Sequence, residues 1–432
     1  MIGIRQRISA TLSRCFARLT GFFRSPTTAN AATQAPPLSF RCLEPRRVLS
    51  VNAAFAAGVL DITIQDDGGN TSAALLSDDG THFFVDADGD QLYDDGTTDP
   101  VELRGLLSEL TRVNVLGDTG VGSFLWRDNF STAPLAALTG DAVAISAVAS
   151  VDLAATAQIE GNVSISAEQS LQIAGALTIN GDWTADVLAP TGQLTGAANA
   201  SLSVSGQATL TAHDVTLGTA TDDQVDFGSL TIHSSGTVEI EEDSSVLDPG
   251  TRLIGDSFAD SFRLTSQGSI ELAPTATLQT TGNLTLVAEG VTADIQINSL
   301  LSTSLGNIDL HAADQIALGN AGQIVNNADG TIQLQADGSG IAMADGASIV
   351  SETGEIHLLA NSSGGGTMTL GQLSTGSSSA TAITLTAFGS ITDATAAEDA
   401  NVLARSGTAV FQSHPRDIHT FPNHIDSDLE QI

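Results

Sequence analysis

Every 24 residues the second half of the chain repeats one motif: GNLTLVA (282–288), GNIDLHA (306–312), GTIQLQA (330–336) and GEIHLLA (354–360). The third and fifth positions of each copy are apolar, the seventh is alanine, and variable residues lie between them. This alternation with a period of two is typical of a β-strand that buries one face. The constant spacing predicts that like positions stack into columns of aliphatic residues and alanine.

Each 24-residue period contains two more short apolar segments. One follows the alanine, as at 295–297 and 316–318, and one precedes the glycine, around Leu278, Leu300, Ile324 and Ile349. Three short strands joined by Gly, Asn, Asp and Ser corners predict an all-β fold, a right-handed single-stranded parallel β-helix with three strands per coil. Looser copies such as GNVSISA (161–167), GQATLTA (206–212) and TAITLTA (381–387) extend the repeats to roughly eleven coils over residues 136–410.

Other repeat architectures fit this period less well. Antiparallel sandwiches are built from units of about 100 residues, and propeller blades take about 40–50 residues each. A leucine-rich repeat has a suitable length, but its leucine-rich helical segment and fixed asparagine are missing. The coil pattern over 136–410 resembles the passenger coils of filamentous haemagglutinins and autotransporters. That resemblance implies a β-helix, and it supports the fold more than any particular activity.

Charge is distributed very unevenly along the chain. Residues 1–50 contain eight Arg and one acid, a balance of +7, whereas residues 51–432 contain seven Arg and 49 acids, a balance of −42. The sum is the net charge of −35, and the chain has no Lys. A field of this sign repels nucleic acids and anionic lipids, so no nucleic-acid partner is expected.

The first 57 residues form an N-terminal address segment in our interpretation. Residues 1–24 alternate Arg with apolar residues, a Pro/Ala/Thr linker follows, and RCLEPRRVLSVNAAFAAGVL (41–60) has the order of a secretory signal with small-x-small sites around Ala54 and Ala56. LEPR (43–46) followed by Val48-Leu49-Ser50 resembles the LEPR-XLL segment of large, repetitive bacterial proteins, with Val48 in place of the usual Leu. The resemblance implies export to the cell surface. No stretch of 18 apolar residues exists, so no transmembrane helix is expected.

Residues 58–135 are predicted to form a β-rich N-terminal cap, because repeat arrays need atypical units to close the ends of their cores. This region contains DADGDQLYDDG (86–96), which resembles the DxDGDG runs of dockerin and thrombospondin type 3 repeats. The sequence offers two interpretations of it, a Ca²⁺ loop and a solvated acidic turn. The candidate metal ligands are Asp86, Asp88, Asp90 and Asp94, although Gln91 and Thr97 replace the expected Gly and bidentate acid.

A search of the outward positions for chemistry identifies no catalytic or cofactor-binding residues. Asp309 and His311 share a strand face, but no nucleophile or metal partner aligns with them in the sequence. The run Glu239, Glu241, Glu242 and Asp243 is predicted to be a charged loop after a strand, and Trp183 to fill a coil end or face. Residues 411–432 are expected to be a disordered tail.

The sequence therefore predicts a secreted or cell-surface structural repeat protein of the adhesin type, and not an enzyme. Its candidate partners are other surface proteins or polysaccharides, and its oligomeric state is undetermined. Two alternatives stay open: a β-helix enzyme acting on polysaccharide, which requires paired carboxylates on one face, and a truncated piece of a larger surface protein without independent activity.

Overall fold

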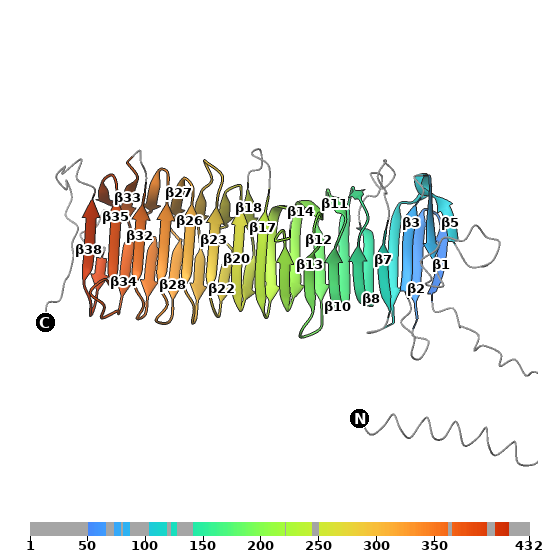
Figure 1. Cartoon of the computed structure of the whole chain (residues 1–432), viewed down its shortest axis with the longest axis horizontal. Coiled ribbons are helices and arrows are strands. Elements are labelled where there is room, and N and C mark those ends of the chain that lie inside the picture. The colour runs from blue at the N-terminus through green and yellow to red at the C-terminus, as the bar shows by residue number, and fades with distance from the viewer. Residues whose placement is uncertain are drawn as a thin grey trace, which may run out of the picture. The chain divides into compact units, whose positions relative to one another are not determined.

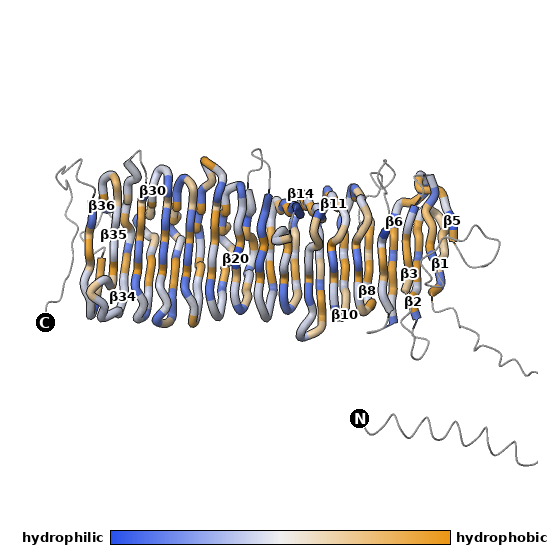
Figure 2. Tube along the Cα trace, in the orientation of Figure 1, coloured by the Kyte–Doolittle hydropathy of each residue, from blue (hydrophilic) through white to orange (hydrophobic). Residues whose placement is uncertain are grey.

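The fold is all-β, a parallel β-solenoid of about 11 turns, as the sequence predicts (Figure 1). The computed structural model describes residues 51–65, 73–78, 81–86, 103–118, 122–127, 141–220, 222–243, 250–361, 365–394 and 402–413. The chain divides into two units, Met1–Arg47 and Val48–Ile432, and every described residue lies in the second. Along the strands the Cα trace alternates between apolar and polar residues, which is the hydropathy signature of one buried face (Figure 2).

The four heptapeptides stack directly on one another and form what we call the heptapeptide face. Leu286, Leu310, Leu334 and Leu358 are in register from coil to coil and are fully buried, and so are the Ile/Leu and Ala columns on either side. The strands of this face are β17 (Thr237–Glu242), β20 (Ser261–Ser266), β23 (Leu284–Ala288), β26 (Ile308–Ala312), β29 (Ile332–Ala336), β32 (Ile356–Ala360), β35 (Ile383–Ala387) and β38 (Ala409–Ser413).

Two further faces complete each coil of this half. The narrow face consists of β18 (Thr251–Leu253), β21 (Ile270–Leu272), β24 (Ile295–Ile297), β27 (Gln315–Leu318), β30 (Gly340–Met343), β33 (Thr367–Leu370) and β36 (Ile391–Asp393). The third face is called the neutral face because its outward side chains from β22 onward are uncharged; only its first strand, β19, has an outward acid, Asp256. It consists of β19 (Asp256–Ala259), β22 (Thr277–Thr280), β25 (Leu300–Thr303), β28 (Gln323–Asn326), β31 (Ser348–Ser351), β34 (Gln372–Thr375) and β37 (Val402–Ala404).

The short apolar segment predicted around Leu300 is strand β25, and its core residue is Leu301. Leu301, not Leu300, is in register with Leu278 and Ile324 and is fully buried, whereas Leu300 points outward. Because Leu300 and Leu301 are equally apolar, hydropathy alone does not show which of them points inward. Thr303 shows which leucine points inward. It lies two residues after Leu301 on the same strand and must also point inward to bond to a backbone carbonyl.

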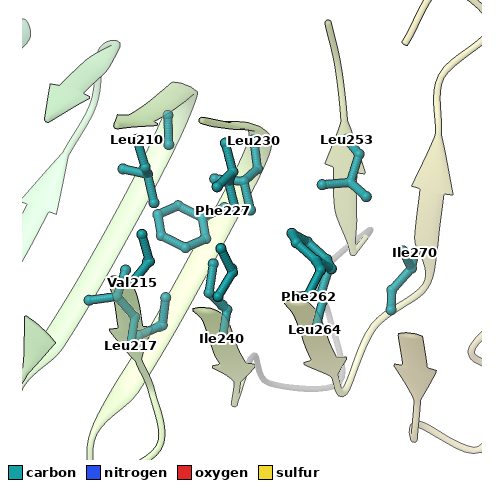
Figure 3. Packing of buried hydrophobic residues seen from close by; sticks show 14 of the residues in the cluster. Leu210, Val215, Leu217, Phe227, Leu230, Ile240, Leu253, Phe262, Leu264 and Ile270 are labelled. Atoms are coloured by element: carbon teal, nitrogen blue, oxygen red, sulfur yellow. The ribbon is translucent and has the colours of Figure 1, made fainter. Parts of the chain in front are cut away.

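The coils before residue 243 are built differently, because several of their strands run through a corner without a break. These long strands are β8 (Asp141–Leu153), β10 (Asn162–Ile173), β14 (Ser201–Ala212) and β16 (Gln224–Ser234). They alternate with the short strands β9 (Ala157–Ile159), β11 (Ala176–Ile179), β12 (Trp183–Val187), β13 (Gln193–Gly196) and β15 (Asp214–Leu217), all paired in parallel. Here large side chains fill the core, and Figure 3 shows Phe227 among aliphatic residues of this segment such as Leu210 and Leu230.

Antiparallel pairs lie at the N-terminal end of the described solenoid and include residues 51–56, which precede the cap region predicted over 58–135. Strands β2 (Val59–Ile64) and β3 (Ala73–Asp78) pair in parallel with β6 (Arg112–Gly117) and β7 (Ser123–Trp126), which in turn pair with β8. On the outer side, β1 (Val51–Ala56) pairs antiparallel with β2, β4 (His82–Asp86) with β3, and β5 (Leu103–Leu106) with β4. The single turn of 3-10 helix η1 (Leu107–Glu109) follows β5, and its Leu107 is buried.

An inward-facing polar column lines the corner after the neutral face. The side chains of Thr303, Asn326 and Thr375 are buried and bond to backbone carbonyls of the corner glycines, with Asn326 Nδ2 lying 2.8 Å from both Gly306 O and Gly330 O. Buried backbone carbonyls need partners, and these side chains supply them where the ladder is interrupted. Successive corners approach each other so closely that only glycine fits: a Cβ on Gly330 would lie 2.0 Å from Gly306 O.

Candidate functional surfaces

A histidine–carboxylate cluster stands on the heptapeptide face. His311 Nε2 lies 2.8 Å from Asp337 Oδ2, and Gln335 Nε2 donates to Asp337 Oδ1 at 3.0 Å. Partial burial opposes ionisation of Asp337, but hydrogen bonds from His311, Gln335 and Asn361 outweigh it and hold the pKa of Asp337 below its usual value. Burial raises the pKa of Asp309, and the nearby His311 opposes that rise.

This cluster orients an imidazole but brings no nucleophile to it. The neighbours of His311 in its own column are Val287 and Gln335, neither of which has a nucleophilic atom. A triad needs a hydroxyl or thiol within hydrogen-bond reach of the imidazole nitrogen that the carboxylate leaves free. The sequence located Asp309 and His311 on one face but missed Asp337, which lies at a corner one coil further on and has no strand periodicity to reveal it.

A second pair lies on the same face. His357 Nε2 is 2.9 Å from Glu355 Oε2, and Thr381 Oγ1 donates to Glu355 Oε1 at 3.3 Å. Hydrogen bonds from Ser379, His357 and Thr381 hold the pKa of Glu355 below its usual value, against slight desolvation. Together with Arg263 on β20 and Glu239 and Glu241 on β17, these groups make the heptapeptide face a charged one; the narrow face is charged as well, through the Arg252–Glu271 ion pair at 3.1 Å.

The neutral face offers the opposite chemistry. From β22 to β37 its outward positions contain hydroxyl, amide and aliphatic side chains and no charged one. One outward column reads Gln279, Ser302, Val325, Val350, Ser374 and Leu403. The other reads Thr277, Leu300, Gln323, Ser348 and Gln372. In a chain of net charge −35, so long an uncharged stretch of surface is an unexpected feature.

An aromatic pair begins the first of these columns. Phe258 on β19 is in register with Gln279, is half exposed, and stacks on the His233 ring with the ring centroids 5.0 Å apart and the planes at 16°. This pair could not be predicted from the sequence, because Phe258 alternates with Ser257 and Ala259, small residues that both point inward.

A buried carboxyl lies where the two halves of the solenoid meet. Glu242 ends β17 and points inward, at the position that Ser266 and then Ala288 occupy in the next coils. Its side chain is only 2% exposed, accepts a hydrogen bond from Phe227 N at 3.2 Å, and bonds to Thr251 Oγ1. Burial raises the pKa of Glu242 to about 7, against the opposing hydrogen bonds from Thr251 and Ser266.

The charged loop predicted for this run is therefore wrong. Glu239 and Glu241 stand outward on β17, Glu242 is in the core, and only Asp243 lies beyond the strand. The physical reason is local: among the described residues no strand pairs with residues 224–227 of β16 on the side facing the next coil, so the Glu242 carboxyl supplies the acceptor that Phe227 N would otherwise lack. Trp183, predicted to fill a coil end or face, is fully buried in the core, and its ring stacks on that of Phe227 with the centroids 6.4 Å apart and the planes at 9°.

The predicted calcium loop is only partly within the described residues. Asp86 is buried at the end of β4, whereas Asp88, Asp90 and Asp94 lie outside those residues. Where the structure is described, no three His, Cys, Asp or Glu side chains gather as a metal site. The Ca²⁺ assignment to Asp86, Asp88, Asp90 and Asp94 stays a prediction.

Comparison with known proteins places the chain in no group. No protein-family model, no curated protein and no solved structure matches it. Among the described segments no helix has the length and apolar character that crossing a membrane requires. Function must therefore be argued from the surfaces themselves.

Proposed function

We propose that this protein is an extracellular or cell-surface structural repeat protein of the adhesin type, which offers the long faces of its solenoid for contact. The observation that carries the proposal is the filled interior, in which aliphatic and aromatic side chains are buried along the whole described solenoid. Groups able to bind a partner therefore stand on flat outer faces, where equivalent positions recur coil after coil and allow many weak contacts to add up.

Export is supported by the N-terminal segment and by the charge of the remainder. The LEPR-XLL-like residues 43–50 directly precede β1, and a balance of −42 over residues 51–432 keeps an extended surface soluble. Val51 is buried and Phe55 packs edge-to-face on Phe83 at 4.9 Å. Cleavage at Ala54 or Ala56 would remove β1 from the cap, so any processing that preserves the fold cuts before Val51.

Localisation in the native cell tests this proposal. Cells are fractionated, and intact cells are treated with a protease that cannot enter them, with a cytoplasmic protein as the control. The account expects the chain in the surface or medium fraction, digested by the added protease while the control survives. Recovery of the chain with the protected control in the cytoplasm would overturn the proposal.

A second candidate is a β-helix enzyme acting on a polysaccharide, and one observation favours it. Asp309 on β26 and Asp337 at the corner after β29 both lie near His311, and two nearby carboxylates are what glycoside hydrolysis uses. Release of reducing sugar from neutral polysaccharides by the wild type, and its loss in Asp337→Asn, would establish this activity. The pKa of Asp309 is raised and that of Asp337 is lowered, as an acid and a base would require, so this assay decides between the two functions; we favour the structural role because the filled interior leaves both carboxylates on the outer surface.

A further inference from the structure

We propose that the neutral face, from Phe258 on β19 to Leu403 on β37, is a docking track for one extended chain of an uncharged polysaccharide. This inference rests on the proposed surface function and specifies its partner. It follows from the charges, dimensions and hydrogen-bonding groups of the face, taken in that order.

Charge excludes most polymers from this face. The strands from β22 to β37 present no outward cation, and acids such as Asp345 and Glu352 lie in the corners on either side. A polyanion, whether nucleic acid, uronate polymer or anionic membrane, would meet net repulsion, since the exposed Arg405 in the corner after β37 is outnumbered by these acids. A cationic partner would be drawn away from the face, to the corners and to the acids of the heptapeptide face. An uncharged partner is neither repelled by these acids nor attracted away from the face.

Dimensions exclude a second folded copy. A four-residue strand is about 13 Å long, and the six strands from β22 to β37 extend over about 29 Å at the usual coil spacing, so the face covers roughly 400 Å². A stable protein–protein interface needs about 800 Å² from each partner. A narrow, long surface fits a single extended polymer that runs parallel to the solenoid axis.

Backbone pairing excludes an extended peptide. Peptides that bind to sheets add a strand at a free edge and use its unpaired backbone groups. The strands β22, β25, β28, β31 and β34 are each paired on both sides, so this face has only side chains to offer.

The remaining chemistry matches a neutral sugar chain. Gln279, Gln323 and Gln372 are exposed amides that donate and accept hydrogen bonds, as the hydroxyls of a sugar require. Val325 and Val350 are adjacent in register and form an apolar strip for the C–H faces of pyranose rings. At the end of the same column the half-exposed Phe258 ring provides an aromatic contact for a sugar.

Cosedimentation with insoluble particles tests the proposal. The full chain is mixed with microcrystalline cellulose, chitin and insoluble (1→3)-β-glucan as neutral probes, and with pectate beads as the acidic probe. The account expects binding to at least one neutral polymer and none to pectate. In the variant Ser302→Glu/Val350→Glu, which adds two charges to the neutral face two coils apart, the bound fraction at low protein concentration should fall at least tenfold.

A charge-matched control variant separates the face from the net charge. Gln333→Glu/Thr386→Glu adds the same two charges to outward positions of the heptapeptide face and should bind like the wild type. Equal melting temperatures of the two variants show that both are folded. Equal binding by both variants, or binding of the wild type to pectate alone, would overturn the proposal. So would concentration-dependent dimerisation abolished by the neutral-face charges. If the chain is found at the cell surface but ignores every neutral probe, only this inference fails and the proposed function stands.

Discussion

The two halves of the solenoid solve the same packing problem with different side chains. Before Glu242 the coils use long strands that turn corners, and Trp183 and Phe227 fill the volume that this less regular path leaves. After Glu242 every strand has three to six residues, and from β23 onward most of the core consists of repeated small layers of Ile, Leu and Ala. A regular backbone path thus permits a core built by repetition, whereas an irregular path requires individual, bulky side chains at particular positions.

The largest expected effect comes from removing one of those bulky side chains. Trp183→Ala should lower the free energy of unfolding by about 3–5 kcal/mol, since it leaves a large cavity against Phe227. Because coils in a solenoid contact only their neighbours, amide hydrogen exchange should accelerate in β10, β12 and β14 and stay unchanged in β29 and β32. Leu334→Ala should show the reverse distribution. Uniform acceleration in both variants would show that the halves are not separate.

The junction between the halves should give the solenoid a pH-dependent stability. The pKa of Glu242 rises on folding from 4.5 to about 7, so the folded state binds this proton more tightly. Its stabilising contribution is complete below pH 4.5 and is lost as the pH rises through 7, a change of roughly 3 kcal/mol. Asp226, which faces Glu242 from β16, adds to the rise, and burial raises the pKa of nearby Asp223 and Glu241 as well.

Substitution by glutamine isolates that contribution. Urea titrations at several pH values should show Glu242→Gln as stable as the wild type at pH 4.5 and more stable at pH 8. The outward Glu239→Gln on the same strand serves as the control and should leave the pH dependence intact. A wild-type stability that stays flat between pH 5 and pH 8 would mean that Glu242 is not held protonated.

The regular half should depend on its corner glycines. Gly330→Ala should cost roughly 1–3 kcal/mol, because the added Cβ would lie 2.0 Å from Gly306 O and force two corners apart. Gly319→Ala is the matched change, since its Cβ would meet only the tip of the Asn298 side chain, which can move. Thermal melts should separate the two variants, and equal melting temperatures would show that the corners tolerate expansion.

The smallest expected effect concerns the cap. If Asp86, Asp88, Asp90 and Asp94 bind Ca²⁺, the ion should raise the melting temperature modestly through mass action. Asp88→Asn/Asp90→Asn should remove that rise without changing the melt in chelator. A wild-type melt that is identical with Ca²⁺ and with chelator would end the calcium interpretation.

The sequence predicted the fold wherever the period was constant. The 24-residue spacing assigned the buried Leu286, Leu310 and Leu334 and the outward Asp309 and His311, because a strict repeat leaves one register only. It could not resolve Leu300 from Leu301, two leucines with equal hydropathy.

Features that do not recur with the 24-residue period could not be predicted from the sequence. Glu242 was assigned to a loop because an inward carboxyl contradicts the alternation of its strand, and its reason for being buried is an unpaired backbone amide that only the structure reveals. Asp337 and Phe258 were missed for a related reason: their partners, His311 and His233, are neighbours only once the coils are stacked.

Spin-label distances along the heptapeptide face test the stacking of the coils most directly. One spin label is placed at Val410 and the other at Thr285, Arg263 or Glu239 in turn. All four residues lie in one outward column, and the three pairs are separated by five, six and seven coil steps. At about 4.8 Å per step, double electron–electron resonance should give increments of about 5 Å between the pairs, from about 24 Å to about 34 Å. Distances that do not increase in equal steps, or that scale with sequence separation, would contradict the solenoid.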